Sequence, residues 1–238
     1  GFKLMIDFHY SDYWADPEKQ FKPKAWESHS FKELVNDVST HTKEVLIALK
    51  EKNIYPEWVQ VGNEIPNGML WPEGKIENFD KLSKLLNSGY DAVKDVLPSS
   101  KVIIHLDQGD DRKRFIEFFD NHTANGGKYD VIGVSYYPYW VNKNYKETID
   151  NLMNNLNEYI DRYEKEVMVC EIGGEDTEVE DTYNMLKEVI ERVREIPQGK
   201  GLGVFYWEPE GAFSWSKYKL SAWGNDGKPS KALDAFID

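Results

Sequence analysis

The chain has 238 residues, 40% of them hydrophobic, which is enough to bury the core of one large domain. Its 42 acidic and 29 basic residues give a net charge of −13 at pH 7, which argues against nucleic acid and anionic membrane surfaces as partners. No stretch approaches the roughly twenty apolar residues that span a membrane. The single cysteine, Cys170, excludes an internal disulfide.

Strand and helix patterns alternate along the chain. Strands are predicted at residues 4–10, 58–64, 101–106, 129–137, 167–172 and 203–207. Apolar residues at helical spacing predict helices near 31–49, 79–96, 115–119, 149–163 and 183–193, with a short one at 229–237. Ser30-Phe31-Lys32-Glu33 has the pattern of a helix capping box. Such alternation predicts a parallel sheet with helices outside.

This order of elements fits both an eight-fold barrel and an open doubly wound sheet, and the strand ends decide between them. Every predicted strand finishes in a polar or aromatic residue: His9, Glu64, Asp107, Tyr137, Glu171 and Trp207. A barrel gathers all its strand ends around one pocket, whereas an open sheet uses mainly those at its switch point. No glycine-rich phosphate loop follows a strand. We predict a TIM (β/α)8-type barrel, of which this chain supplies six strand–helix units.

Two of these strands end in a glutamate, Glu64 and Glu171, and each glutamate follows a short apolar run typical of a buried strand. Either one alone could be a solvated loop acid, but the pair favours two carboxylates that meet in space. The chain is also rich in aromatic residues, with 8 Trp, 14 Tyr and 11 Phe, which often form platforms for sugar rings. Two carboxylates across a pocket are the components of glycoside hydrolysis. One protonates the departing oxygen, and the other attacks the anomeric carbon, or activates water if the gap is wider.

Four motifs resemble those of glycoside hydrolase family 53: DFHYSDYWADP at residues 7–17, VGNE at 61–64, SYYP at 135–138 and FYWEP at 205–209. The resemblance implies an endo-β-1,4-galactanase of clan A that has a (β/α)8 barrel, retains anomeric configuration and acts on galactan or arabinogalactan. It makes Glu64 the acid/base and Glu171 the nucleophile. We predict no cofactor and no metal, because the sequence shows no metal-binding cluster. The family's usual threonine and aromatic after the second glutamate are absent here, where Ile172-Gly173-Gly174 follows.

Further residues are predicted to contact the substrate. Asn63 would bond the sugar 2-hydroxyl, and Trp207 is expected to lie under the cleaved sugar. Alternation along strands places Asp7 with His9, His105 with Asp107, and Ser135 with Tyr137 on faces that we interpret as barrel interior. A core role is about as well supported as a functional one for His105. The predicted substrate-binding residues are His9, Asp12, Trp14, Asp16, Asn63, His105, Asp107, Tyr137 and Trp207. Three other tryptophans, Trp71, Trp140 and Trp215, either line neighbouring subsites or cover core.

The resemblance begins at the family's third barrel strand, and the clan's arginine at the end of the second strand has no counterpart here. We therefore expect residues 1–238 to form a single catalytic domain that is incomplete at its N-terminus. The apolar strands at residues 1–10 and 203–207 would then be open edges through which the chain could self-associate. A secreted, periplasmic or cell-surface bacterial protein is expected, with any export signal upstream.

Two functional interpretations stay open. The first is a retaining endo-galactanase, and the second is a non-catalytic or inactive carbohydrate-binding barrel fragment. Within the enzyme class, a mannanase or glucanase of the same clan is also compatible, because loop geometry discriminates axial from equatorial hydroxyls.

Overall fold

In the computed structural model, which describes residues 1–237, the chain forms two units. The first comprises Gly1–Asp107 and Lys113–Ile132, and the second comprises Gln108–Arg112 and the chain from Gly133 onward. The single domain expected from the sequence stays a prediction. Within residues 1–237, no helix is both long and apolar enough to cross a membrane.

The first unit alternates strands and helices as predicted. Its main elements are β1 (Met5–Phe8), α1 (Phe31–Glu51), β2 (Trp58–Val61), α2 (Phe79–Val96), β5 (Lys101–Leu106) and most of α3 (Arg112–Ala124). β1 pairs in parallel with β2, and β2 in parallel with β5, so the carboxyl ends of these strands share one edge. Some short elements lie in segments for which the sequence predicts no helix or strand. They are an antiparallel hairpin of β3 (Gly68–Met69) and β4 (Gly74–Lys75), and 3₁₀ turns at Lys24–Trp26 and Ile76–Asn78.

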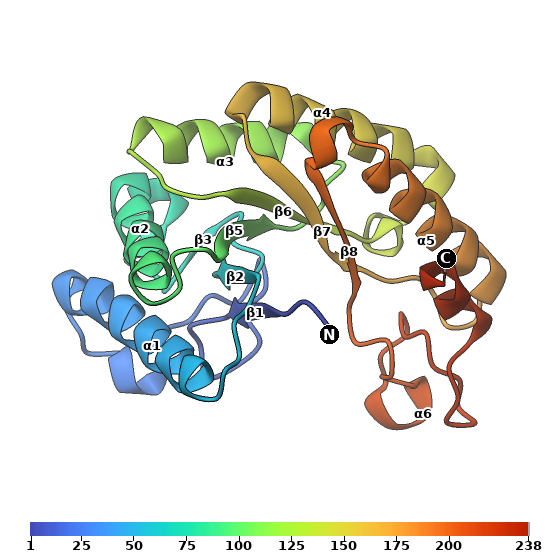
Figure 1. The fold of residues 1–238 in the computed structure, drawn as a ribbon, viewed down its shortest axis with the longest axis horizontal. Coiled ribbons are helices and arrows are strands. Elements are labelled where there is room, and N and C mark those ends of the chain that lie inside the picture. Colours follow the sequence, from blue (N-terminus) through green and yellow to red (C-terminus); the bar gives the residue numbers. More distant parts are fainter. Residues whose placement is uncertain (238) are drawn as a thin grey trace. The chain divides into compact units, whose positions relative to one another are not determined.

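Helix α1 shows how local signals set these elements. The predicted capping box forms: Ser30 Oγ accepts from the backbone N–H of Glu33, and Glu33 Oε2 accepts from the backbone N–H of Ser30 at 2.7 Å. The apolar stripe of α1, including Leu34, Val38 and Leu46, is fully buried. α1 and α2 lie side by side in the first unit (Figure 1), so this stripe is covered on one side by a neighbouring helix.

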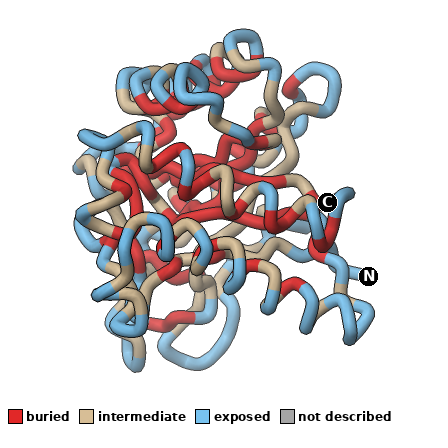
Figure 2. The backbone as a smooth tube through the Cα atoms, turned by 90° about the vertical axis from the view of Figure 1, so that its left-hand side faces the viewer, coloured by how far each residue is buried: buried red, intermediate tan, exposed pale blue. Residues whose placement is uncertain are grey.

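The second unit continues the same alternation. Its elements are β6 (Val131–Tyr136, whose first two residues belong to the first unit), α4 (Ile149–Tyr163), β7 (Glu166–Ile172), α5 (Val179–Arg194), β8 (Gly201–Tyr206) and the short α6 (Phe213–Ser216). The strands follow the order β6-β7-β8, and β7 pairs in parallel with β8. Burial concentrates along the strands, whereas the outer faces of the helices are exposed (Figure 2). The helix predicted at 229–237 is a 3₁₀ turn, Lys231–Phe236, shown beside α5 in Figure 1.

Candidate active site

Glu64 lies at the carboxyl end of β2, in the first unit. β2 ends at Val61 because Gly62 has φ +82°, a conformation that side-chain-bearing residues rarely adopt. A Cβ on Gly62 would also lie 3.0 Å from Cγ2 of Ile65. Glu64 itself has φ +43°, which is uncommon for a non-glycine residue and often marks a functional site. The next residue is anchored, since the Ile65 backbone N–H donates to the His105 carbonyl at 3.1 Å. The backbone around Glu64 is therefore held in an unusual but defined conformation.

Asn63, beside Glu64, is buried, and its side chain is held by three hydrogen bonds. Its Nδ2 donates to the Ala15 carbonyl at 2.9 Å. Its Oδ1 accepts from Gln60 Nε2 at 3.0 Å and from His105 Nδ1 at 2.9 Å. An amide nitrogen carries two hydrogens, so one bond from Nδ2 leaves a second donor that suits a sugar hydroxyl.

His105 is fully buried at the end of β5. Burial, with a smaller electrostatic effect of the nearby His9, lowers the pKa of His105 to about 3. The ring is therefore neutral near pH 7, and its bond to Asn63 Oδ1 assigns the proton to Nδ1. In this structure His105 orients Asn63.

His9 and Asp7 form a pair on β1 and the residues that follow it. His9 Nδ1 accepts from the Ala15 backbone N–H at 2.9 Å, so the ring proton belongs on Nε2, which donates to Asp7 Oδ2 at 3.1 Å. Asp7 Oδ1 accepts from Gln60 Nε2 at 2.7 Å. The shared face predicted for Asp7 and His9 is confirmed, and Gln60 links this pair to Asn63.

The predicted acidic contacts of this unit already have protein partners. Asp107 pairs with Arg114. Asp12 Oδ2 accepts from the backbone N–H of Lys24 at 2.7 Å. Asp16 accepts from the backbone N–H of Glu18 at 2.8 Å and pairs with Lys19 Nζ at 3.2 Å, within its own turn. These contacts shape the loops, and the substrate-binding roles of these residues stay predictions. Trp14 is 62% exposed and therefore suits a ligand platform.

Glu171 is buried near the end of β7, in the second unit. The Tyr137 hydroxyl donates to Glu171 Oε2 at 3.0 Å. Tyr218 hydrogen-bonds Tyr137 in turn. Burial, and then the nearby Tyr206, Glu171 and Glu208, raise the pKa of Tyr218, so its hydroxyl stays protonated. Since Tyr137 donates to the carboxylate, its oxygen is left to accept from Tyr218. Two tyrosines thus form a chain of donors that favours an ionised Glu171.

Gly173 leaves room for Tyr137 and for the loop around Leu220 to lie close to the end of β7. A Cβ on Gly173 would lie 3.0 Å from the Leu220 carbonyl and 3.1 Å from Cε1 of Tyr137. The Tyr206 hydroxyl donates to the same Leu220 carbonyl at 2.7 Å. The departure from the family pattern after Glu171 therefore has a structural consequence, because Gly173 allows the loop that carries Tyr218 to approach.

Trp207 follows β8, and its backbone N–H donates to the Ile172 carbonyl at 3.0 Å. Its role as a platform stays a prediction. Trp140 and Trp215 are 62% and 64% exposed, so neither covers core. Trp71, in the first unit, donates from Nε1 to the Asn67 carbonyl at 3.0 Å.

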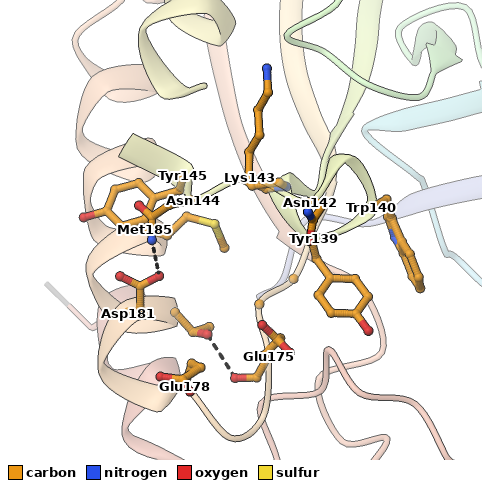
Figure 3. A pocket seen from close by; sticks show the side chains of 14 residues that line it. Tyr139, Trp140, Asn142, Lys143, Asn144, Tyr145, Glu175, Glu178, Asp181 and Met185 are labelled. Carbon is orange, nitrogen blue, oxygen red and sulfur yellow. Dashed lines mark hydrogen bonds between the residues drawn. The ribbon is translucent and has the colours of Figure 1, made fainter. Parts of the chain in front are cut away.

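A pocket of about 800 Å³ lies beyond the ends of β6 and β7 in the second unit. Figure 3 shows Glu178 and Asp181 on the side of α5, and the rings of Tyr139 and Trp140 on the opposite side. Asn144 Nδ2 donates to Asp181 Oδ2 at 3.2 Å. Carboxylates and amides beside aromatic rings can bind the hydroxyls and the apolar faces of sugars.

The predicted residues divide between the units. His9, Asp12, Trp14, Asp16, Asn63, Glu64, His105 and Asp107 lie in the first, and Tyr137, Glu171 and Trp207 lie in the second. Sequence reasoning missed Gln20, Gln60 and Tyr218 as site residues. Gln60 alternates with Val59 and Val61 in a buried strand, which was an available signal. Gln20 and Tyr218 lie in loops without periodicity.

Comparisons with known proteins identify the family. The model of glycosyl hydrolase family 53 matches residues 1–236. The chain is 38% identical to an uncharacterised protein of Niallia circulans, over 94% of this chain and 69% of that one. It is 34% identical to arabinogalactan endo-beta-1,4-galactanase A of Aspergillus niger, over 88% of this chain and 65% of that enzyme. The chain thus spans about two thirds of the length of these relatives.

Solved structures agree on the fold. The GH53 catalytic domain of Ignisphaera aggregans aligns with all of this chain and 74% of its own, with a TM-score of 0.89 and 33% identity. A structure of fungal beta-1,4-galactanases aligns with 98% of this chain and 77% of its own, with a TM-score of 0.87 and 29% identity. A xylanase of Caldicellulosiruptor owensensis, 16% identical with a TM-score of 0.61, shares the fold alone. These alignments confirm the α/β fold of TIM-barrel type with six parallel strands, and the chain belongs to glycosyl hydrolase family 53.

Proposed function

We propose that this protein is a retaining endo-β-1,4-galactanase that hydrolyses internal bonds of galactan or arabinogalactan. The main support is the surroundings of Glu171, an 8% exposed carboxylate that accepts the Tyr137 hydroxyl at 3.0 Å. Such a donor stabilises the ionised form, which a nucleophile needs. The family and the names of the Aspergillus relatives supply the substrate class.

The proposed reaction has two steps. In the first, Glu171 attacks the anomeric carbon while Glu64, protonated, gives its proton to the departing glycosidic oxygen. In the second, Glu64 takes a proton from water, which then hydrolyses the glycosyl–enzyme ester and releases Glu171. Asn63 would hold the sugar 2-hydroxyl with its remaining Nδ2 hydrogen, a contact that strengthens in the transition state. A polysaccharide is too large to enter a cell intact, so the proposal includes secretion.

A reducing-sugar assay tests the proposal. Purified protein should release reducing ends from unbranched β-1,4-galactan, and the Glu171→Gln and Glu64→Gln proteins should not. Mannan and β-1,4-glucan, tested in parallel, decide between galactanase and the other clan activities. Galactan turnover that persists in Glu171→Gln would contradict the assignment of the nucleophile.

The second candidate function is carbohydrate binding without catalysis. The observation that favours it is the pocket beyond β6 and β7, whose aromatic rings and carboxylates suit a sugar and whose lining includes neither Glu64 nor Glu171. Affinity electrophoresis tests this candidate. It would be supported if galactan in the gel slows migration of the protein while the reducing-sugar assay detects no cleavage.

A further inference from the structure

Gln20 is a buried amide, 2% exposed, in the loop that follows β1. Its Nε2 lies within hydrogen-bond distance of three backbone carbonyls: Asn63 at 2.8 Å, Asp16 at 3.0 Å and Glu64 at 3.1 Å. All three partners are acceptors, so the nitrogen, not the oxygen, of the amide must face them. One side chain therefore joins a surface loop to the two residues at the end of β2.

Two of these carbonyls belong to the dipeptide that carries the proposed acid/base. Glu64 has φ +43°, a left-handed conformation that residues other than glycine rarely adopt. Such a conformation persists only where surrounding contacts hold it. On the C-terminal side of Glu64, the hydrogen bond from the Ile65 N–H to the His105 carbonyl supplies one such contact. Gln20 Nε2 supplies the other, because it lies within hydrogen-bond distance of the carbonyls that precede and follow the Glu64 Cα.

Gln20 is itself anchored. Its backbone carbonyl accepts from the Trp71 N–H at 2.8 Å. On its N-terminal side, Asp16 and Lys19 exchange backbone hydrogen bonds of 3.2 and 3.0 Å, which closes the turn that leads into Gln20. Because these backbone hydrogen bonds fix the position of Gln20, its side chain can restrain the Asn63 and Glu64 carbonyls.

We propose that Gln20 is a positioning residue that holds the backbone of Glu64 so that its carboxyl can donate and accept the proton in both catalytic steps. The inference rests on the proposed function, in which Glu64 is the acid/base. It differs from a general packing role because it predicts a defect in proton transfer, not in substrate binding.

The test compares four variants. Gln20→Leu removes the donor, and Gln20→Glu keeps the shape but replaces Nε2 with an acceptor. Glu64→Ala removes the acid/base itself. The matched control is Asn67→Leu, because the exposed Asn67 Nδ2 donates to the Pro17 carbonyl at 2.9 Å and so joins the same two loops without touching Asn63 or Glu64.

We expect both Gln20 variants to lose about tenfold to a hundredfold in kcat on galactan, with KM changed less than about twofold. On an aryl β-1,4-galactobioside with a good leaving group, which needs no acid for the first step, sodium azide should restore turnover of the Glu64→Ala protein and yield β-galactobiosyl azide. The Gln20 variants should lose less activity on this substrate than on galactan. Asn67→Leu should behave as the unmodified protein. Hydrogen exchange of residues 62–66 should be faster in the Gln20 variants alone.

The outcomes separate the two claims. If Glu64→Ala keeps full turnover on galactan, the proposed acid/base is wrong. If Glu64→Ala shows the loss and the azide rescue but both Gln20 variants match Asn67→Leu, the positioning role of Gln20 is overturned. If the protein has no activity, unchanged exchange at residues 62–66 in the Gln20 variants would overturn the backbone restraint on its own.

Discussion

The Tyr137 hydroxyl donates a hydrogen bond of 3.0 Å to Oε2 of Glu171, so the buried carboxylate at the end of β7 has a fixed neutral donor. A hydrogen bond to a charged group contributes roughly 1.5–3 kcal/mol. The contact therefore stabilises the ionised carboxylate and restricts the directions in which it can attack.

Tyr137→Phe should lower kcat on galactan by about tenfold or more, because the carboxylate loses its donor. The acid limb of the pH–rate profile should move to higher pH, since a carboxylate without this donor holds its proton more strongly. Tyr218→Phe, one hydroxyl further from Glu171, should have a smaller effect in the same direction. Tyr13→Phe, on a residue 76% exposed, serves as the control. An unchanged profile for Tyr137→Phe would mean that the bond does not support the nucleophile.

Hydrolysis should retain the anomeric configuration. Retaining enzymes place their two carboxyl groups about 5–5.5 Å apart, and inverting ones about 6.5–9.5 Å apart. We expect the shorter separation between Glu64 and Glu171 in a crystal structure, and the β-anomer as the first product in proton NMR spectra. An α-anomer formed before mutarotation would require Glu171 to be a base that activates water.

The pocket beyond β6 and β7 should contribute to polymer binding. Replacing the exposed Trp140 by Ala should raise KM for galactan several-fold, because stacking on an indole is lost, and should leave KM for a short aryl galactoside unchanged. Trp215→Ala, which changes an equally exposed tryptophan outside the lining of this pocket, tests whether the effect is specific to the pocket. Equal effects of Trp140→Ala on the two substrates would point to a general structural change.

His122 should make the stability of the protein depend on pH. It is fully buried on α3, and burial lowers its pKa to about 4 from the usual 6.5, although a hydrogen bond with the backbone of Lys128 opposes part of the shift. The folded state thus binds fewer protons than the unfolded state between these values. The contribution of His122 is complete above about pH 6.5 and is lost as pH falls toward 4, a change of roughly 3 kcal/mol.

Urea unfolding measures this effect. The difference in unfolding free energy between the unmodified protein and His122→Gln should shrink as pH falls from 7 to 4.5. His105 is present in both proteins, so its own contribution cancels. The control variant Phe118→Leu, at another buried position of α3 that carries no titratable group, should show no such trend. A constant difference across the pH range would show that His122 does not titrate as its burial predicts.

The sequence by itself determined the alternation of elements, the capping of α1 and the position of both glutamates at strand ends. These features depend on signals a few residues long: apolar spacing of two or 3.6 residues, a Ser-x-x-Glu box, and a glycine that ends a strand. The motif at residues 7–17 identified the family for the same reason, since its information lies in contiguous residues.

Only the tertiary structure decided how these residues are held. Gln20 lies more than forty positions from Asn63 and Glu64, and Gln60 more than fifty from Asp7, so no local period links them. The loop carrying Tyr218 reaches Tyr137 because Gly173 leaves room for it, and the turn around Asp16 uses both of its carboxylate oxygens. Hydrogen-bond partners in loops depend on where the chain returns in space, and a buried polar group must find one of them. The sequence therefore indicates which side chains can do chemistry, and the folded loops decide which of them are held in place to do it.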